Sequence, residues 1–466
     1  MSIEHTFGEL RSLLEQAPSE EVWATLCEHC HIAARGAGRV DTGRVDTGRF
    51  EAEVLPYILD RLRGWPDALR IARMDWLDEA AGQGDHVCLP LVRHINVEPT
   101  LRTPKELRRM WNAPGLGEAT MVSAGDGQLK TFSLDMLRGA PITPNLRELR
   151  LREGLIHRKK LGVVSELAGL RALHTGAGER PRLLLEALGA HGMLPKMERL
   201  WMGVTALMQE HAALLASCGA LEELAIWSNL MIADEGFEVM CDGALADAPL
   251  TSLNVGGCGL TLPSFARLAA SRWPLRSLYW WGNSIGAAEL ELLAGSRVIE
   301  GLQQLNIGDG RMGGGALAPL LSRRGPSALR ELWLARGGEI GAAGMEAGVS
   351  GEVLRGLAAL HTEMCRWEER AFPALLAGLS GGSIAQLFLR SNGLDDTSAA
   401  ALAAADLPAL RTLDLSNNQL TNVGLAALLE APWITQLEVL DISNCLVDAD
   451  MRQRAAASGV SLKRIG

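Results

Sequence analysis

The chain has 466 residues, a formal net charge of -10 at pH 7 and 47% hydrophobic residues. This acidic balance argues against a general nucleic-acid binder, because affinity for phosphate backbones comes largely from Lys and Arg. No stretch reaches about 18 uncharged apolar residues, and the segment from Met1 to Leu10 contains Glu4 and Glu9, so neither membrane insertion nor export is signalled. These features predict a cytoplasmic protein, and the excess of Arg over Lys with abundant Ala and Gly indicates a bacterial source.

The first part of the chain is predicted to be helical. Ser19 is suited to cap a helix that opens with two glutamates. Further helices are expected from Phe50 to Leu62 and from Pro66 to Leu77, since proline is favoured in a first helical turn. We therefore expect residues 1–88 to form a small all-α domain that covers the start of whatever follows.

Two cysteines of this helical part have a spacing that attracts metal or haem hypotheses. Cys27, Cys30 and His31 have the spacing of covalent haem attachment, and Cys27 and Cys30 with His86 or Cys88 have the ligand types of a zinc site. Buried cysteines also act as small apolar residues on a helix face. We favour this structural interpretation, so no metal, haem or other cofactor is predicted.

One phrase of six residues recurs from Leu146 to Ile442. Its first and fourth places are apolar, its sixth place is apolar in nearly all copies, and its second, third and fifth places are free. Places are counted from the first apolar residue, so the residue after the phrase is the seventh place. Twelve copies begin at Leu146, Leu170, Met197, Leu221, Leu250, Leu275, Leu302, Leu329, Leu357, Ile384, Leu410 and Leu437. They lie 24 to 29 residues apart, a period that predicts a solenoid of stacked units. Two fainter copies, Val92-Ile95-Val97 and Leu116-Ala119-Met121, move the expected start to about residue 89.

The phrase has the alternation of a short strand. In the copy at Leu410, Leu413 and Leu415 point to one side, while Thr412 and Asp414 point to the other. Three residues after the last apolar residue of the phrase, Asn or Cys recurs and is suited to hydrogen-bond the backbone where the chain leaves the sheet. These residues are Asn229, Cys258, Asn283, Cys365, Asn392, Asn418 and Cys445. The rest of each repeat has apolar residues at helical spacing, which predicts an outer helix.

Repeats of about 27 residues with an outer helix and this Asn/Cys ladder resemble the ribonuclease-inhibitor type of leucine-rich repeat protein. The resemblance implies an α/β fold: a right-handed horseshoe-shaped solenoid over residues 89–466, with a parallel inner sheet, outer helices and clear repeats over 146–446. The segment from Leu69 to Arg93 is similar to a small helical module that accompanies bacterial leucine-rich repeats. The implied function is protein binding, and no catalytic triad or carboxylate pair in the sequence favours an enzyme.

Aromatic residues are concentrated on the predicted surface side of the strands. At the third, fifth and seventh places of the twelve phrases lie Trp201, Trp227, Tyr279, Trp281, Trp333 and Phe388. Aromatic residues make up 5% of the chain, so about two would be expected at these places. His361 and Asn306 occupy the fifth place between the aromatic ones. We interpret this row as anchors for a partner protein, and packing of the rings on one another is the alternative.

Charged residues at the two ends of the array are expected to orient that partner. Arg150 and Arg152 occupy the first surface strands, and Asp414 and Asp441 occupy the last ones. The function predicted from the sequence is therefore a non-enzymatic scaffold that binds another protein on the concave face, with no nucleic acid or membrane as partner.

A second hypothesis assigns a role to the helical part. The run from Leu55-Pro56 through Trp76 has some F-box character. On this hypothesis the chain is an effector or ubiquitin-ligase-like adaptor, whose N-terminal helices recruit machinery while the repeats select the substrate.

Overall fold

The computed structural model describes residues 3–36, 50–83, 86–97, 103–124, 134–151, 158–178, 181–310, 315–325, 327–457 and 461–462. The chain divides into two compact units, Met1–Thr205 and Ala206–Gly466, here called unit 1 and unit 2. Within the described residues, every helix is too short or too polar to cross a membrane.

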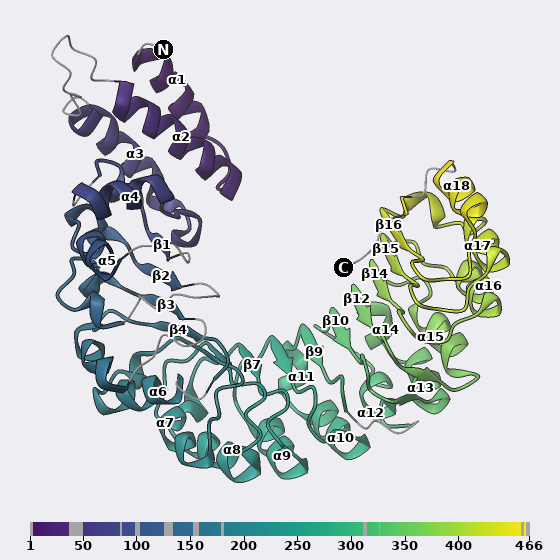
Figure 1. Cartoon of the computed structure of the whole chain (residues 1–466). Helices are drawn as coiled ribbons and strands as arrows, with labels where there is room; N and C mark the ends of the chain where they lie inside the picture. Colours follow the sequence, from purple (N-terminus) through teal and green to yellow (C-terminus); the bar gives the residue numbers. More distant parts are fainter. Residues whose placement is uncertain are drawn as a thin grey trace. The chain divides into compact units, whose positions relative to one another are not determined.

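Unit 1 combines helices with the first strands of the repeat array (Figure 1). The helix predicted from Pro66 to Leu77 was wrong in its first half, because residues 67–69 form only a short turn and the next helix begins at Met74. The helices of unit 1 are α1 (Ile3–Leu14), α2 (Glu20–Gly36), α3 (Leu55–Arg61), α4 (Met74–Gln83), α5 (Pro104–Trp111) and α6 (Pro181–Ala190). Its strands are β1 (His94–Val97), β2 (Met121–Ala124), β3 (Glu148–Leu151), β4 (Ala172–Thr175) and β5 (Arg199–Met202), which pair in parallel in sequence order. The helices before β1 thus share a unit with five repeats, and a domain boundary near residue 88 stays a prediction.

The second repeat of unit 1 has a different register from the one predicted. Met121 pairs with His94 and with Glu148, which are both third places of their phrases. The phrase of this repeat therefore begins at Ala119, and the copy predicted to begin at Leu116 was wrong by three residues. With this correction the first three strands follow one another at an even spacing, as expected for repeats of constant length.

Unit 2 continues the same architecture. Its main sheet contains β6 (Glu223–Ala225), β7 (Ser252–Asn254), β8 (Ser277–Tyr279), β9 (Gln304–Asn306), β10 (Glu331–Trp333), β12 (Ala359–His361), β14 (Gln386–Phe388), β15 (Thr412–Asp414) and β16 (Val439–Asp441). These strands are parallel and follow sequence order. This topology confirms the predicted α/β repeat fold with a parallel sheet.

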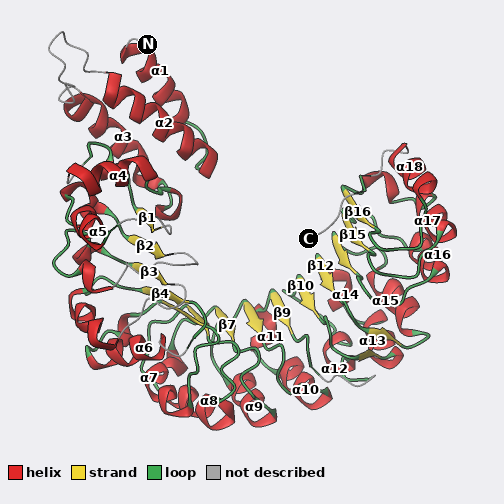
Figure 2. Cartoon of the chain, viewed as in Figure 1, coloured by secondary structure: helices red, strands yellow, loops and turns green. Residues whose placement is uncertain are grey.

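The helices of unit 2 form a layer on the opposite side of the sheet from the inner face (Figure 2). They are α7 (Ala212–Ala216), α8 (Ala233–Asp242), α9 (Leu262–Ala270), α10 (Ala287–Gly295), α11 (Val298–Gly301), α12 (Ala318–Leu321), α13 (Ala342–Val349), α14 (Val353–Gly356), α15 (Ala371–Leu379), α16 (Asp396–Ala404), α17 (Asn422–Leu429) and α18 (Ala449–Ala457). Two further strands, β11 (Glu339–Ile340) and β13 (Arg366–Trp367), form a separate small sheet that the sequence did not predict.

The predicted ladder residues connect neighbouring repeats as expected. The amide oxygen of Asn418 accepts hydrogen bonds from the backbone N–H groups of Asn392 and Leu394. Its amide nitrogen donates to the carbonyls of Leu389 and Leu415. Asn418 is 5% exposed, so these bonds satisfy backbone groups that water does not reach. Asn418 thereby ties its own turn to the one before it.

Cysteine performs a simpler version of this role. The thiol of Cys258 donates to the carbonyl of Ile226, and that of Cys445 donates to the carbonyl of Leu415. Both thiols are buried, and all eight cysteines are free. Burial raises the pKa of Cys258 to about 12, so it stays a neutral thiol.

Candidate functional site

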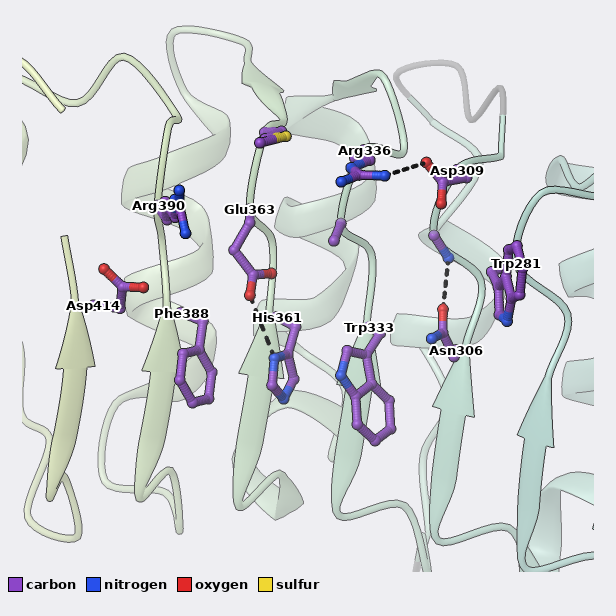
Figure 3. Close-up of a pocket in the computed structure, with 13 residues that line it drawn as sticks. Trp281, Asn306, Asp309, Trp333, Arg336, His361, Glu363, Phe388, Arg390 and Asp414 are labelled. Carbon is purple, nitrogen blue, oxygen red and sulfur yellow. Dashed lines mark hydrogen bonds and ion pairs between the residues drawn. The ribbon is translucent and has the colours of Figure 1, made fainter. Parts of the chain in front are cut away.

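Four rings form a row along the inner face of unit 2. Tyr279 on β8 and Trp333 on β10 have ring centroids 5.9 Å apart. Trp333 stacks on His361 of β12 at 4.8 Å, and His361 stacks on Phe388 of β14 at 4.4 Å. Figure 3 shows the last three side by side on neighbouring strands. We call these four residues the aromatic row.

Strand register explains why the rings line up. Trp333, His361 and Phe388 are direct partners in the parallel pairing of β10, β12 and β14. Parallel strands lie about 4.8 Å apart, which is close to the stacking distance of aromatic rings. His361 therefore has a ring on each side. Both sequence interpretations apply here, because the rings pack on one another and still line an open surface.

Hydrogen bonds hold the polar end of this row. Nε2 of His361 lies 3.3 Å from a carboxylate oxygen of Glu331, and Nδ1 lies 3.6 Å from one of Glu363. Gln304 donates to Glu331 and accepts from the hydroxyl of Tyr279. Each of these groups comes from the third, fifth or seventh place of a phrase. The row is therefore oriented before any partner arrives.

The aromatic row borders a groove of about 650 Å³. Trp281, Trp333 and Phe388 supply apolar lining, and Asp309, Arg336, Glu363, Arg390 and Asp414 supply charged groups (Figure 3). Nε of Arg390 and one carboxylate oxygen of Glu363 are buried, and among the described residues neither has a hydrogen-bond partner. Arg336 forms a 4.0 Å ion pair with Asp309. The groove thus combines apolar contact area with polar groups that retain bonding capacity.

Trp281 reaches the groove because the same place of the preceding repeat is occupied by glycine, Gly256. A Cβ atom added at Gly256 would lie 2.2 Å from Cε2 of Trp281. The indole therefore lies directly against the Gly256 backbone. Trp227, which follows β6, is half-buried and does not line the groove.

Two of the predicted partner-binding carboxylates are buried, so the expectation that they face the surface was wrong, while their role in partner binding stays a prediction. Asp414 and Asp441 are 4% and 1% exposed. Each accepts a hydrogen bond from the backbone N–H two residues later, from Ser416 and Ser443. A short carboxylate makes this turn bond easily and folds back onto its own chain. Burial raises the pKa of Asp414, which remains at the end of the groove as a lining group.

The remaining predicted site residues lie in unit 1. Trp201 on β5 is 40% exposed, and its ring centroid lies 4.6 Å from that of His174. Arg150 pairs with Glu148 on the same strand, β3, with Nε 2.6 Å from the carboxylate. Arg152 lies outside the described residues. The structure therefore brings Tyr279, Trp281, Trp333, His361 and Phe388 together and leaves Trp201 and Arg150 in the other unit.

The cysteines proposed as zinc ligands are packed in the helical part of unit 1. Cys27, Cys30 and Cys88 are buried, and burial raises the pKa of Cys30 to about 12. His86 stacks on Trp76, whose indole N–H donates to His31. Among the described residues, no group of three or more His, Cys, Asp or Glu side chains is placed to hold a metal ion.

Several polar residues that line the groove or bond to the aromatic row were not predicted. Glu331, Glu363, Gln304 and Arg390 occupy third or seventh places of the phrases, so their position was readable from the repeat. Their residue types gave no signal, because polar residues are common on any exposed strand face.

Comparisons with known proteins agree with the repeat architecture. A profile of the family described as "Leucine Rich repeat" matches residues 407–429, which include the phrase at Leu410. No curated protein sequence matches the chain. A leucine-rich repeat protein from Leptospira interrogans is 16% identical, with a TM-score of 0.42, over 81% of this chain and 91% of that chain.

Two further solved structures are similar at the same level. A chain of the Rad7–Elc1 complex in yeast is 16% identical with a TM-score of 0.45, over 88% of this chain and 90% of that chain. The TLR13–ssRNA13 complex is 16% identical with a TM-score of 0.42, over 78% of this chain and 54% of that chain. Values this low transfer no function. The profile match shows a leucine-rich repeat at residues 407–429, and the recurring phrase builds a parallel sheet of such units in both parts of the chain.

Proposed function

We propose that the chain is a cytoplasmic, non-enzymatic scaffold of the bacterial ribonuclease-inhibitor-like type that binds a partner protein in the groove of unit 2. The observation that carries this proposal is the aromatic row of Tyr279, Trp333, His361 and Phe388 beside an open groove of about 650 Å³. The mixed Asn and Cys ladder supports the proposed subtype.

The aromatic row has the physical properties of an interface centre. Its rings are only partly buried, yet stacking already restricts their rotamers, so a partner would lose little side-chain entropy by ordering them. Aromatic residues in such positions commonly dominate interfaces, and truncating one costs about 2 kcal/mol or more. A partner that covers the rings gains apolar burial without distorting the sheet.

The charged groups of the groove would give the interface its specificity. Arg390 and Glu363 lie on adjacent repeats and each has a buried polar atom without a hydrogen-bond partner among the described residues. A partner that supplies an acceptor for the guanidinium and a donor for the carboxylate would satisfy both. Both atoms are already out of contact with water in the free chain, so a partner would gain affinity here by supplying the bonds that they lack.

The test is affinity capture with the full chain, followed by measurement of Kd with the partner that is identified. Trp333→Ala and Phe388→Ala should each weaken binding by about 30-fold, which corresponds to about 2 kcal/mol. Trp367→Ala is the matched control, because Trp367 is also half-buried but lies on β13, outside the groove.

Thermal unfolding of each variant shows whether the sheet survives the substitution. Binding that is unchanged by Trp333→Ala and Phe388→Ala in folded protein, or lost equally with Trp367→Ala, would contradict the proposed binding surface.

A further inference from the structure

A second pocket, of about 280 Å³, lies within unit 1 and is distinct from the groove of unit 2. Four arginines line it: Arg147, Arg150, Arg171 and Arg199. They come from β3, from β5 and from the residues just before β3 and β4, so they approach the pocket from adjacent repeats. The three carboxylates of the lining are Asp67, Glu148 and Glu198.

The buried carboxylate of Glu148 forms ion pairs with two of the arginines. Glu148 is 4% exposed, and its carboxylate lies 2.6 Å from Nε of Arg150 and 3.0 Å from a terminal nitrogen of Arg199. His174 lies 3.2 Å from the same carboxylate. Burial alone would raise the pKa of Glu148, but these partners lower it to about 2, so it is ionised at neutral pH. Both guanidinium groups are thereby held in place.

This single carboxylate leaves bonding capacity on the arginines. The side chains of Arg150 and Arg199 are 43% and 39% exposed, and a guanidinium has five N–H donors, of which Glu148 uses few. Arg147 is exposed at the same pocket. Asp67 is occupied by the hydroxyl of Thr120, at 2.6 Å. The remaining donors converge on the pocket from several directions.

We propose that this pocket binds a phosphate group, held by Arg147, Arg150 and Arg199 with Arg171 at its edge. A carboxylate presents two oxygens in one plane and suits a single guanidinium fork, whereas a phosphate presents oxygens in several directions and suits arginines from different strands. The four arginines of the lining outnumber its three carboxylates, so the lining carries a net positive charge. The phosphate comes either from solution or from a phosphorylated residue of a partner.

The experiment is isothermal titration calorimetry on the full chain at low ionic strength, with inorganic phosphate, a phosphoserine peptide and acetate as separate titrants. Phosphate or the phosphopeptide should bind at least about tenfold more tightly than acetate. Tighter binding of the phosphopeptide identifies a modified partner as the source, and equal binding identifies free phosphate.

Matched variants test the location. Arg147→Gln and Arg171→Gln should each weaken phosphate binding at least about fivefold. Arg330→Gln is the control for Arg171→Gln, because Arg171 and Arg330 both donate to two carbonyls of the preceding turn, and Arg330 lies in unit 2, outside the pocket. This control should change the Kd less than twofold.

Three results would overturn the proposal: no heat of binding with either phosphate titrant, acetate binding as tightly as phosphate, or equal losses from Arg171→Gln and Arg330→Gln with Arg147→Gln silent. Partner binding in the groove of unit 2 is measured separately, so failure there leaves this test intact.

Discussion

The same place in the repeat carries glutamate in both units, with different neighbours. Glu148 in unit 1 and Glu331 in unit 2 are both third-place residues, on β3 and β10. Glu148 collects two arginines and a histidine, whereas Glu331 collects Gln304 and His361 at the edge of the aromatic row. The repeat determines where a side chain stands, and the residues on adjacent strands determine its chemistry. One scaffold can therefore hold a charged pocket in one unit and an aromatic groove in the other.

The largest expected difference between the units is in the free energy of unfolding that is lost when a ladder residue is replaced by alanine. Asn418→Ala should lower the free energy of unfolding of unit 2 by about 2–3 kcal/mol, because two buried N–H groups and two carbonyls lose their partners. Thr205 occupies the ladder place at the end of unit 1 and donates to the carbonyl of Met202. Thr205→Ala should cost only about 1 kcal/mol. Urea unfolding of both variants checks the ranking, and equal losses would contradict it.

The second largest difference is expected when the third-place glutamate of each unit is replaced by glutamine and the loss in free energy of unfolding is compared. Glu148→Gln should cost about 2 kcal/mol at pH 7, since it leaves two guanidinium groups without their counter-ion. Glu331→Gln should cost less than about 1 kcal/mol, because Gln304 and His361 can bond to an amide oxygen in place of the carboxylate. Chemical denaturation of the two variants against the wild-type chain measures this difference.

The pH dependence of this effect has a defined sign. The pKa of Glu148 is lowered to about 2 in the folded chain, below its ordinary value of 4.5. Its contribution is therefore present above about pH 5 and is lost as the pH falls toward 2. The gap between wild type and Glu148→Gln should shrink over this range. A gap that stays constant from pH 7 to pH 3 would show that the carboxylate is not stabilised by its arginines.

A glycine substitution should disturb the groove of unit 2 alone. Gly256→Ala places a methyl group against the indole of Trp281 and should displace that ring, at a cost of about 1–2 kcal/mol. Near-ultraviolet circular dichroism of the tryptophans reports the displacement. Gly295→Ala, at the end of α10, meets no atom within 4 Å and serves as the control. Identical spectra for both variants would show that Trp281 does not depend on Gly256.

Much of the fold could be predicted from the sequence, because the same pattern of apolar and ladder places recurs in each repeat. The apolar places build the core, and the ladder residues satisfy the turns. The register of β2 was misread because Leu116 and Ala119 are both apolar and lie three residues apart. The small sheet of β11 and β13 was missed because strands of two residues leave no alternation to recognise.

The turns contained a signal that the sequence interpretation did not use. The place after the seventh has a positive φ in each repeat of unit 2, as at Ser228, Gly257, Asp309 and Asn417. Glycine and asparagine favour this conformation, so Gly257, Gly282, Asn417 and Asn444 at one place could have revealed it.

The candidate site was predicted only in part. The repeat placed Trp333, His361 and Phe388 correctly, but their stacking depends on ring rotamers that a sequence does not specify. Asp414 and Asp441 accept a hydrogen bond from the N–H two residues later, as Asn254 and Asn306 also do, but of these four only the two aspartates are buried. Short polar residues at the fifth place fold back, and long aromatic residues project.

Site-specific photo-cross-linking tests the proposed binding surface most directly. Benzoylphenylalanine in place of Phe388 would stand in the groove of unit 2, and in place of Val423, which is 68% exposed on α17, it would stand on the helical layer. We expect the partner to be cross-linked from position 388 and not from position 423. A partner captured from position 423 and absent from position 388 would contradict the account.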